Sequence, residues 1–543
     1  MAGHNRQNRH IRIERSGMFG HSKGMNRRNA HRTDMSRMKR MTPGRLWNRR
    51  WLPCLITSFV TVLGAFAQEA AQSLESWDAI FISGKRVGAV HTKVTPLEEK
   101  GKKYFRVEVT TNLSFKRLND TVTMRQRFGT IETAEGEVLR LDTRTNSGGG
   151  EIRTFGDVQE SGELLLTMEG NGQNRNATVP WGKDVRGPYA VEQSLARKKI
   201  AEGEERELKS YVPDLNKIIT IKLMARKSEP IELGGGVKRD LLRVDSKVTT
   251  TEGSHIPELD TTYWVDEGGQ ILKTFTDAFG GYTTYRTTKE SAEAPVGNER
   301  LDLLASSIIK TASRINASET VRQGKYTLKT TDLDLKGLIP DDIRQKTTLA
   351  EDGKSGTLEV TTQDRMSGPE GPETVAEEYL AASPLVNSDD ERIQDVATTA
   401  TRGVAGDWLK VVALNNWVSR NIRRKNFAVA FAPASTVVRS LSGDCTEHSV
   451  LLAALCRAAG IPAKTVVGLV YVDSLGGFGF HMWNEVYVNR RWVAVDATFR
   501  QTEVDATHIK LGESSLSTVA PYETFLSVVR VFNRLAIEPT DVQ

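Results

Sequence analysis

The residues best suited to covalent chemistry stand at the start of one apolar run, SGDCTEHSVLLAALCRAAGIP, residues 442–462. Asp444 and Glu447 have the spacing of a capping box, so this run predicts a helix that begins at Cys445. The unpaired backbone N–H groups and the positive end of the helix dipole favour a thiolate there. The same N–H groups are suited to stabilise an oxyanion, which makes Cys445 a candidate nucleophile.

The second cysteine in this run, Cys456, is not expected to pair with Cys445. Eleven residues of helix would separate them by about 16 Å at 1.5 Å per residue, whereas a disulfide needs Cα atoms within about 7 Å. Cys456 stands among apolar residues and is expected to be an inert core thiol. Two free thiols in an exported chain favour catalysis, with Cys445 as the reacting group.

A cysteine nucleophile needs a histidine as proton shuttle. His448 lies one helical turn after Cys445 and is a candidate base, a neighbour that tunes the thiol, a structural residue or a substrate-binding residue. His508 is a candidate for lining the cleft or for a packing role. A metal site built on Cys445 and His448 with Cys456 or His481 lacks paired ligand spacing on a second hairpin, so no metal is expected.

The best partner histidine opens the segment HMWNEVYV, residues 481–488. Its alternation predicts a strand with His481 and Trp483 on one face, where Trp483 is a further candidate for contact with the site or the substrate. If the following Asn489-Arg490 forms a two-residue turn, Asp496 becomes the diagonal neighbour of His481. A three-residue loop would place the two side chains on opposite faces and abolish the pair.

These segments resemble the core of the transglutaminase-like superfamily. The resemblance is carried by Gly443-Asp444-Cys445 before the long helix, the helix exit RAAGIP, and the strands HMWNEVY and WVAVD. It implies a papain-like core in which Cys445 is the nucleophile, His481 the base and then the acid, and Asp496 the residue that orients the imidazole. Met482 stands where many relatives have alanine, and the preceding loop DSLGGFGF is glycine-rich, which leaves the choice of substrate open.

The chemistry implied by the resemblance is acyl transfer from an amide. The thiolate attacks the amide carbonyl, an amine leaves, and the thioester passes its acyl group to water or to a second amine. The expected substrate is a protein, peptide or cell-envelope amide, and transfer and hydrolysis both remain open. An envelope cysteine peptidase or amidase is an alternative, as is a non-enzymatic binding scaffold that retains the fold.

The texture of the sequence changes along the chain and predicts an α+β protein with several parts. Short alternating runs separated by Gly and Asn clusters predict antiparallel strands in the first half, with one helical interruption near AVEQSLARKKIAEG. Longer helical patterns followed by strands predict an α+β arrangement for the part that carries Cys445, His481 and Asp496. The expected parts are a basic n-region and signal peptide at 1–67, a mostly antiparallel β-rich domain at 68–290, a linker or small bridging domain at 291–375, a transglutaminase-like domain at 376–515, and an extension at 516–543.

The net charge of +6 comes from the N-terminus alone. Residues 1–50 carry fourteen Lys or Arg against Glu14 and Asp34, a balance of +12, and residues 51–67 carry no charge, so the remainder carries −6. A mildly acidic body argues against a nucleic-acid partner. No acidic loop of EF-hand type supports calcium, and no cofactor is expected.

The N-terminal basicity instead precedes an apolar stretch that ends in Ala65-Phe66-Ala67. This is the pattern of a signal peptide cleaved near Ala67, and it predicts an exported protein, periplasmic or extracellular. A single membrane anchor is the alternative, with membrane contact only through this segment. The n-region is unusually long, so Met38 or Met41 is the expected translation start. The oligomeric state is not predicted.

Overall fold

The computed structural model describes residues 73–543 apart from 118–119, 147–149, 171–172, 298–299, 365, 367–369, 426–430 and 518–522. These residues belong to one compact unit, Glu69–Gln543. The expected n-region and signal peptide, residues 1–67, lie outside the described residues. Within the described part, no helix combines the length and apolar character that crossing a membrane requires.

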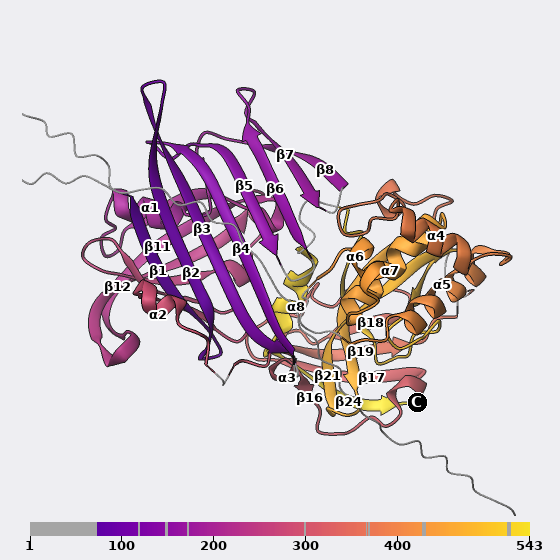
Figure 1. Cartoon of the computed structure of the whole chain (residues 1–543). Coiled ribbons are helices and arrows are strands. Elements are labelled where there is room, and N and C mark those ends of the chain that lie inside the picture. The colour runs from indigo at the N-terminus through magenta and orange to yellow at the C-terminus, as the bar shows by residue number, and fades with distance from the viewer. Residues whose placement is uncertain are drawn as a thin grey trace, which may run out of the picture. The chain divides into compact units, whose positions relative to one another are not determined.

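The first half of the described chain forms one large sheet (Figure 1). Consecutive strands are neighbours in it, except β8 and β9, which stand at its two ends. The strand order is β8-β7-β6-β5-β4-β3-β2-β1-β15-β14-β13-β12-β11-β10-β9, and every pair is antiparallel except β9 with β10. The strands are β1 Leu74–Ile82, β2 Lys85–Glu99, β3 Lys102–Arg117, β4 Asp120–Thr133, β5 Val138–Asn146, β6 Glu151–Val158, β7 Glu163–Gly170, β8 Gln173–Pro180, β9 Val185–Arg186, β10 Glu205–Val212, β11 Lys217–Glu232, β12 Lys238–Thr250, β13 Thr261–Val265, β14 Ile271–Thr276 and β15 Tyr282–Thr287.

Alternation of apolar residues explains why these segments form a sheet. In β11, Ile219, Ile221 and Leu223 are buried while their neighbours are more exposed, as expected for a strand with one face in a core. The helical interruption is confirmed as α1, Ala190–Arg197, whose Leu195 packs in the same core. Short helices α2, Lys289–Glu293, and α3, Leu303–Ser306, follow the sheet.

A second sheet joins two segments that are far apart in the sequence. Its order is β18-β19-β17-β24, with β17 Gln323–Thr330, β18 Gln345–Leu349, β19 Ser355–Thr361 and β24 Leu535–Val542. The region expected to be a linker or bridging domain therefore pairs directly with the region expected to be a C-terminal extension. The segment predicted to be catalytic, residues 376–515, therefore lies between β17 and β24 in the sequence.

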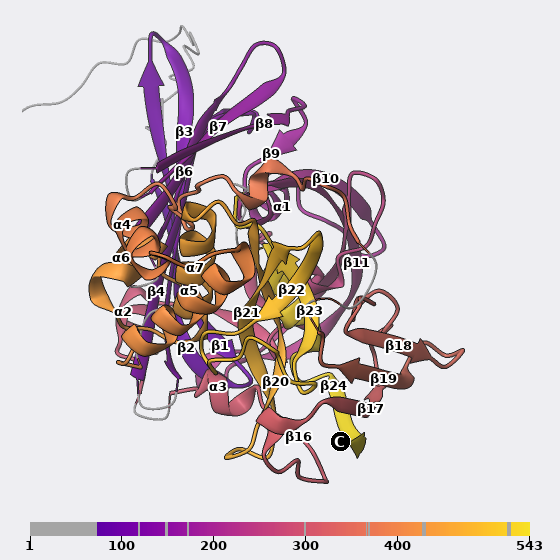
Figure 2. The same cartoon turned by 90° about the vertical axis from the view of Figure 1, so that its right-hand side faces the viewer.

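In the segment that carries Cys445, helices pack against a third sheet. The helices are α4 Glu391–Ala400, α5 Asp407–Asn421, α6 Ala434–Ser440 and α7 Cys445–Ala458, followed after the strands by α8 Leu526–Val531. The strands are β16 Ile309–Lys310, β20 Ala463–Val472, β21 Gly477–Val488, β22 Arg491–Val495 and β23 Ile509–Ser514, in the order β16-β21-β20-β23, with β22 paired to β21. Figure 2 shows α4 to α7 gathered beside β20, β21 and β22. Helices packed on antiparallel sheets agree with the α+β class, while the papain-like core stays a prediction.

The central helix α7 is buried along nearly its whole length, because its sequence is apolar on all sides. It contacts α4, α5 and α6 as well as β20 and β21. Its polar residues lie in and just after the first turn, apart from Arg457 in the last turn. The apolar body thus fixes the helix in the core and presents its N-terminal end, with Cys445, at the edge of that core.

Candidate active site

The nucleophile candidate occupies the first position of α7. Asp444 caps the helix: its side chain accepts from the Thr446 N–H at 2.9 Å, while the Glu447 side chain accepts from the Asp444 N–H at 2.9 Å. The predicted capping box is therefore confirmed. Burial and the neighbouring Asp444 raise the pKa of Glu447 to about 8, so this carboxyl is largely protonated at neutral pH. Cys445 itself is partly exposed and free of any disulfide, as a nucleophile must be.

The hairpin that carries the base has the two-residue turn on which the His–Asp pairing depended. Asn489 and Arg490 both have left-handed backbone, with φ of 51° and 59°, and Val488 pairs with Arg491. A turn of this kind matches the twist of the flanking strands and sets their register. His481 lies within β21 rather than at its start, since the strand begins four residues earlier at Gly477.

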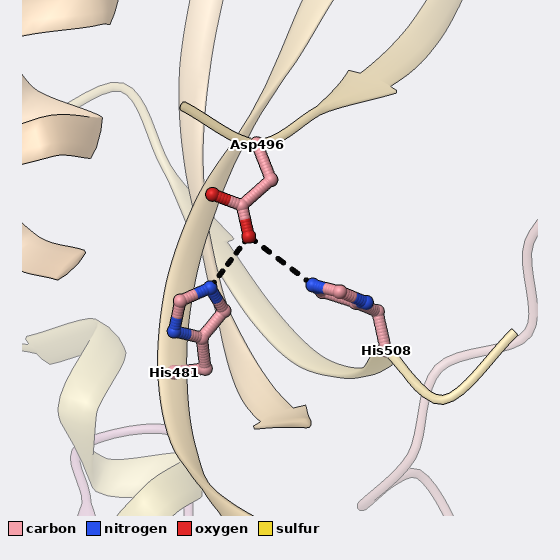
Figure 3. A group of neighbouring side chains, drawn as sticks. All are labelled: His481, Asp496 and His508. Carbon is pink, nitrogen blue, oxygen red and sulfur yellow. Dashed lines mark hydrogen bonds and ion pairs between the residues drawn. The ribbon is translucent and has the colours of Figure 1, made fainter. Parts of the chain in front are cut away.

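The register brings His481 and Asp496 into direct contact (Figure 3). The Nε2 of His481 donates to Oδ2 of Asp496 at 2.7 Å, and both residues are buried. Burial opposes the imidazolium, but the Asp496 charge and hydrogen bond, with a hydrogen bond to Cys445, raise the pKa of His481 to about 9. Because Nε2 is engaged with Asp496, Nδ1 is the nitrogen left for the thiol. The arrangement holds the His481 imidazolium beside Cys445.

Asp496 stays ionised because its buried carboxylate is fully hydrogen-bonded. Its Oδ1 accepts from the Thr498 N–H at 2.6 Å and the Phe499 N–H at 3.2 Å, in a loop closed by two backbone hydrogen bonds between Asp496 and Gln501. Burial alone would raise the pKa of Asp496, but His481 and His508 hold it well below its usual range. A fixed anion in this position orients the imidazole.

A second histidine bonds the same carboxylate oxygen. His508 is fully buried, and its Nε2 lies 3.2 Å from Oδ2 of Asp496 while its Nδ1 lies 3.1 Å from Oδ1 of Asp505. Burial alone would raise the pKa of Asp505, but His508 and neighbouring hydrogen-bond donors lower it to about 2. Burial likewise opposes a charged His508, yet the two carboxylates raise the pKa of His508. Since a carboxylate cannot donate, both ring nitrogens of His508 must, and the ring is an imidazolium.

The other predicted site residues, His448 and Trp483, contact different parts of the site. His448 is buried, and its Nδ1 bonds the Asp444 carbonyl oxygen at 2.6 Å, inside its own helix. Burial lowers the pKa of His448 to about 4, so the ring is neutral and the charged role falls to His481. Trp483 is buried with its ring centre 6.1 Å from that of His481 and 5.2 Å from that of His508, so it packs behind the pair.

The remaining thiol behaves as expected for a core residue. Cys456 is fully buried, and burial raises its pKa to about 12. It stays protonated at any working pH and offers no competing nucleophile.

One group of side chains in the described residues has the composition of a metal site, namely His481, Asp496 and His508. Two ligands of a tetrahedral zinc ion at about 2.1 Å would lie about 3.4 Å apart. The 2.7 Å between His481 and Asp496 is shorter and is that of a direct hydrogen bond. The arrangement thus fits hydrogen-bonded ion pairs better than a metal centre.

Three contributors to the site were not anticipated. The first is Asp505, which resembles Asp496 because the sequence VDAT occurs at 495–498 and again at 504–507. In each copy the Asp Oδ1 accepts from the Thr N–H. This repeat was a usable signal. Phe499 follows the first repeat and lies 4.9 Å from His481 between ring centres while 48% exposed. Arg117 of β3 bonds Asp444 Oδ2 at 2.6 Å, a contact with no local signal.

Comparisons with known proteins identify relatives for part of the chain. Residues 394–497 match the family model of the transglutaminase-like superfamily. A 92-residue stretch is 33% identical to kyphoscoliosis peptidase of Mus musculus, covering 15% of this chain and 13% of the mouse protein. This chain therefore matches only a small part of that relative's length.

Two solved structures match parts of this chain. One, described as a proposed cysteine protease of Cytophaga hutchinsonii, has 15% identity and a TM-score of 0.27, covering 41% of this chain and 86% of that one. The other is a β-barrel-like protein of Brucella abortus with 12% identity and a TM-score of 0.29, covering 40% of this chain and 97% of that one.

Proposed function

Because this chain carries a domain of the transglutaminase-like superfamily at residues 394–497, we propose that it is an exported thiol enzyme that acts on amide bonds through a thioester at Cys445. The observation that carries the proposal is the His481–Asp496 pair at 2.7 Å, with its imidazolium next to a cysteine at a helix N-terminus. Export rests on the N-terminal sequence pattern, with cleavage near Ala67.

The first half of the reaction forms the acyl-enzyme. Nδ1 of His481 holds the proton removed from the Cys445 thiol, and the thiolate attacks the amide carbonyl carbon. The carbonyl oxygen becomes an oxyanion, which the backbone N–H of Cys445 at the start of α7 stabilises. His481 then donates its proton to the leaving nitrogen, the C–N bond breaks, and the acyl group remains on sulfur as a thioester.

The second half returns the enzyme to its starting state. His481, now neutral, removes a proton from water or from a primary amine, which attacks the thioester carbon. The C–S bond breaks and the thiolate re-forms beside the imidazolium. Asp496 keeps the imidazole in one orientation and stabilises its charge through both halves.

Hydrolysis is the branch that one comparison favours, because the mouse relative is named a peptidase. An acceptor amine would use the same acyl-enzyme, so both outcomes share the nucleophile. A non-enzymatic scaffold would have no use for the charged Cys445–His481–Asp496 arrangement.

The reaction type is tested with a glutamine-containing peptide and a labelled primary amine. Ammonia release without label incorporation indicates hydrolysis, and incorporation indicates transamidation. A library of peptide and cell-wall amides extends the search for substrate. Cys445→Ala must abolish every turnover, whereas Cys456→Ala, which removes the inert thiol, must not. Equal turnover by the wild type and Cys445→Ala would contradict the proposal.

A further inference from the structure

The catalytic domain holds a run of positive charge that the mechanism does not use. From 408 to 443 the sequence has six Lys or Arg and no Asp or Glu, although residues 68–543 together carry −6. Four of these six cations stand at the end of α5 and just after it, and another cation, outside this run, lies on the loop after Asp496. We call these five the cationic rim: Arg420, Arg423, Arg424, Lys425 and Arg500. All five side chains belong to exposed residues.

The rim borders the nucleophile on one side. The Gly443 N–H donates to the Arg424 carbonyl oxygen at 3.0 Å, and Arg424 forms a β-bridge with Ser442, so this strand segment runs beside the turn that leads into Cys445. The buried His448 lies one helical turn after Cys445, and the Lys425 charge adds to burial in lowering the pKa of this ring. Positive charge therefore lies next to the start of α7.

The rim borders the catalytic histidine on its other side. Phe499 packs on the His481 ring, and the next residue, Arg500, donates from Nε to the Ser419 Oγ at 3.3 Å. Ser419 directly precedes Arg420 on α5. The end of α5 thus extends from the loop beside His481 to the turn beside Cys445, and it carries cations along this whole edge.

The rim cations lack ion-pair partners among the residues that the structure describes. Within the described part of the chain, none of the five forms an ion pair with a carboxylate. Their guanidinium contacts are to neutral oxygens: Arg423 to the Arg420 carbonyl at 2.8 Å, and Arg424 to the Ser440 carbonyl at 3.4 Å. By contrast, Lys410 and Arg439 of the same sequence run pair with Asp407 and Asp390. Clustered like charges repel and gain nothing for the fold, so their placement points to an anionic ligand.

We propose that the rim selects peptide substrates in which Asp or Glu residues flank the reacting amide. This inference rests on the proposed function, because the rim surrounds the groups that would attack that amide. A carboxylate-bearing peptide satisfies both requirements at once: its amide meets Cys445 and its side chains meet the rim. The exposed Phe499 ring adds an apolar contact between the two. A nucleic acid would meet the charge but offers no peptide amide to the thiol.

The test compares two peptides that differ only in whether the residues flanking the amide are Asp or Ser. Binding to Cys445→Ala is followed by anisotropy of an uncharged fluorophore, and turnover by wild type is measured separately. The rim variant is Arg420→Gln/Lys425→Gln, because neither side chain makes a contact that holds the fold in the described residues. The matched control is Lys336→Gln, another exposed lysine, and thermal unfolding confirms that all variants are folded.

At low salt we expect the Asp peptide to bind and react about tenfold better than the Ser peptide. The rim variant should lose most of that preference through KM, with the Ser peptide unchanged and Lys336→Gln like the wild type. Salt at 1 M should have the same effect as the rim variant, since the Debye length falls to about 3 Å.

The outcomes separate the two proposals. If no peptide reacts, the amide chemistry fails, but binding to Cys445→Ala still decides the rim. Equal binding of the Asp and Ser peptides, or an equal loss in Lys336→Gln, overturns the rim assignment. A single-stranded oligonucleotide of the same charge that binds more tightly than the Asp peptide also overturns it, in favour of a nucleic-acid surface.

Discussion

His508→Gln tests whether the buried imidazolium between Asp496 and Asp505 sets the electrostatics of the site. The ring centres of His508 and His481 are 5.5 Å apart. At an effective dielectric constant of about 20, two positive charges at that distance repel by about 3 kcal/mol, or about 2 pKa units. Removing the His508 charge therefore makes the His481 imidazolium easier to keep. The alkaline limit of activity should move from near pH 9 upward by about 1 to 2 units.

The same substitution should also destabilise the fold. Asp496 and Asp505 are buried, and each loses its contact with the shared cation, for which a cost of about 3–5 kcal/mol is expected. The free energy of unfolding is measured by chemical denaturation at pH 7. Adding Asp505→Asn should recover part of the loss, because one unpaired carboxylate is then removed.

The assay is the pH dependence of kcat/KM on any amide that the enzyme turns over. His255→Gln is the matched control, since His255 forms a similar 2.7 Å contact with Asp260 but at the surface. It should change neither the pH profile nor the stability measurably. If His508→Gln behaves like His255→Gln in both measurements, the reasoning from a charged His508 is refuted.

Three further predictions concern the neighbouring residues. Asp496→Asn should lower kcat by about 10²–10⁴-fold, measured with substrate at saturation, because the neutral side chain of Asn no longer stabilises the His481 imidazolium. Arg117→Gln should cost about 1–3 kcal/mol of unfolding free energy, measured by denaturation, since Asp444 Oδ2 has no hydrogen-bond partner besides this ion pair among the described residues. If Asp444→Asn lowers the free energy of unfolding as much in Arg117→Gln as in the wild type, the two side chains do not stabilise each other and this prediction is wrong. Cys456→Ala should leave kcat/KM within about twofold, and a loss above tenfold would show that the buried thiol takes part.

Short-range signals carried most of the site prediction. The capping spacing of Asp444 and Glu447 determines where α7 begins, and this depends on a few neighbouring residues alone. The His481–Asp496 pair depended on one turn, whose first residue, Asn489, readily adopts left-handed backbone. Patterns of this kind act within one element or one hairpin, so they can be read before any tertiary structure is known.

Contacts between distant segments could not be anticipated in the same way. The pairing of β17 with β24 and the Arg117–Asp444 ion pair join segments hundreds of residues apart. Neither segment carries a local pattern that names its partner, because pairing of strands is decided by the packing of whole faces. His508 was recognised as a candidate for lining the cleft or for packing. Its position behind Asp496, wholly buried, follows from the second VDAT loop folding back beside the first.

The measurement that tests the account most directly is the rate at which iodoacetamide alkylates Cys445 near pH 6, followed by mass spectrometry of the labelled peptide. The account predicts preferential labelling of Cys445 over a thiol in an unstructured peptide, no labelling of buried Cys456, and a loss of about tenfold or more in His481→Gln. His448→Gln, which changes the histidine nearest in sequence, should retain most of the rate. Labelling of Cys445 no faster than the peptide thiol, or a rate that depends on His448 and not on His481, would contradict the proposed nucleophile and base.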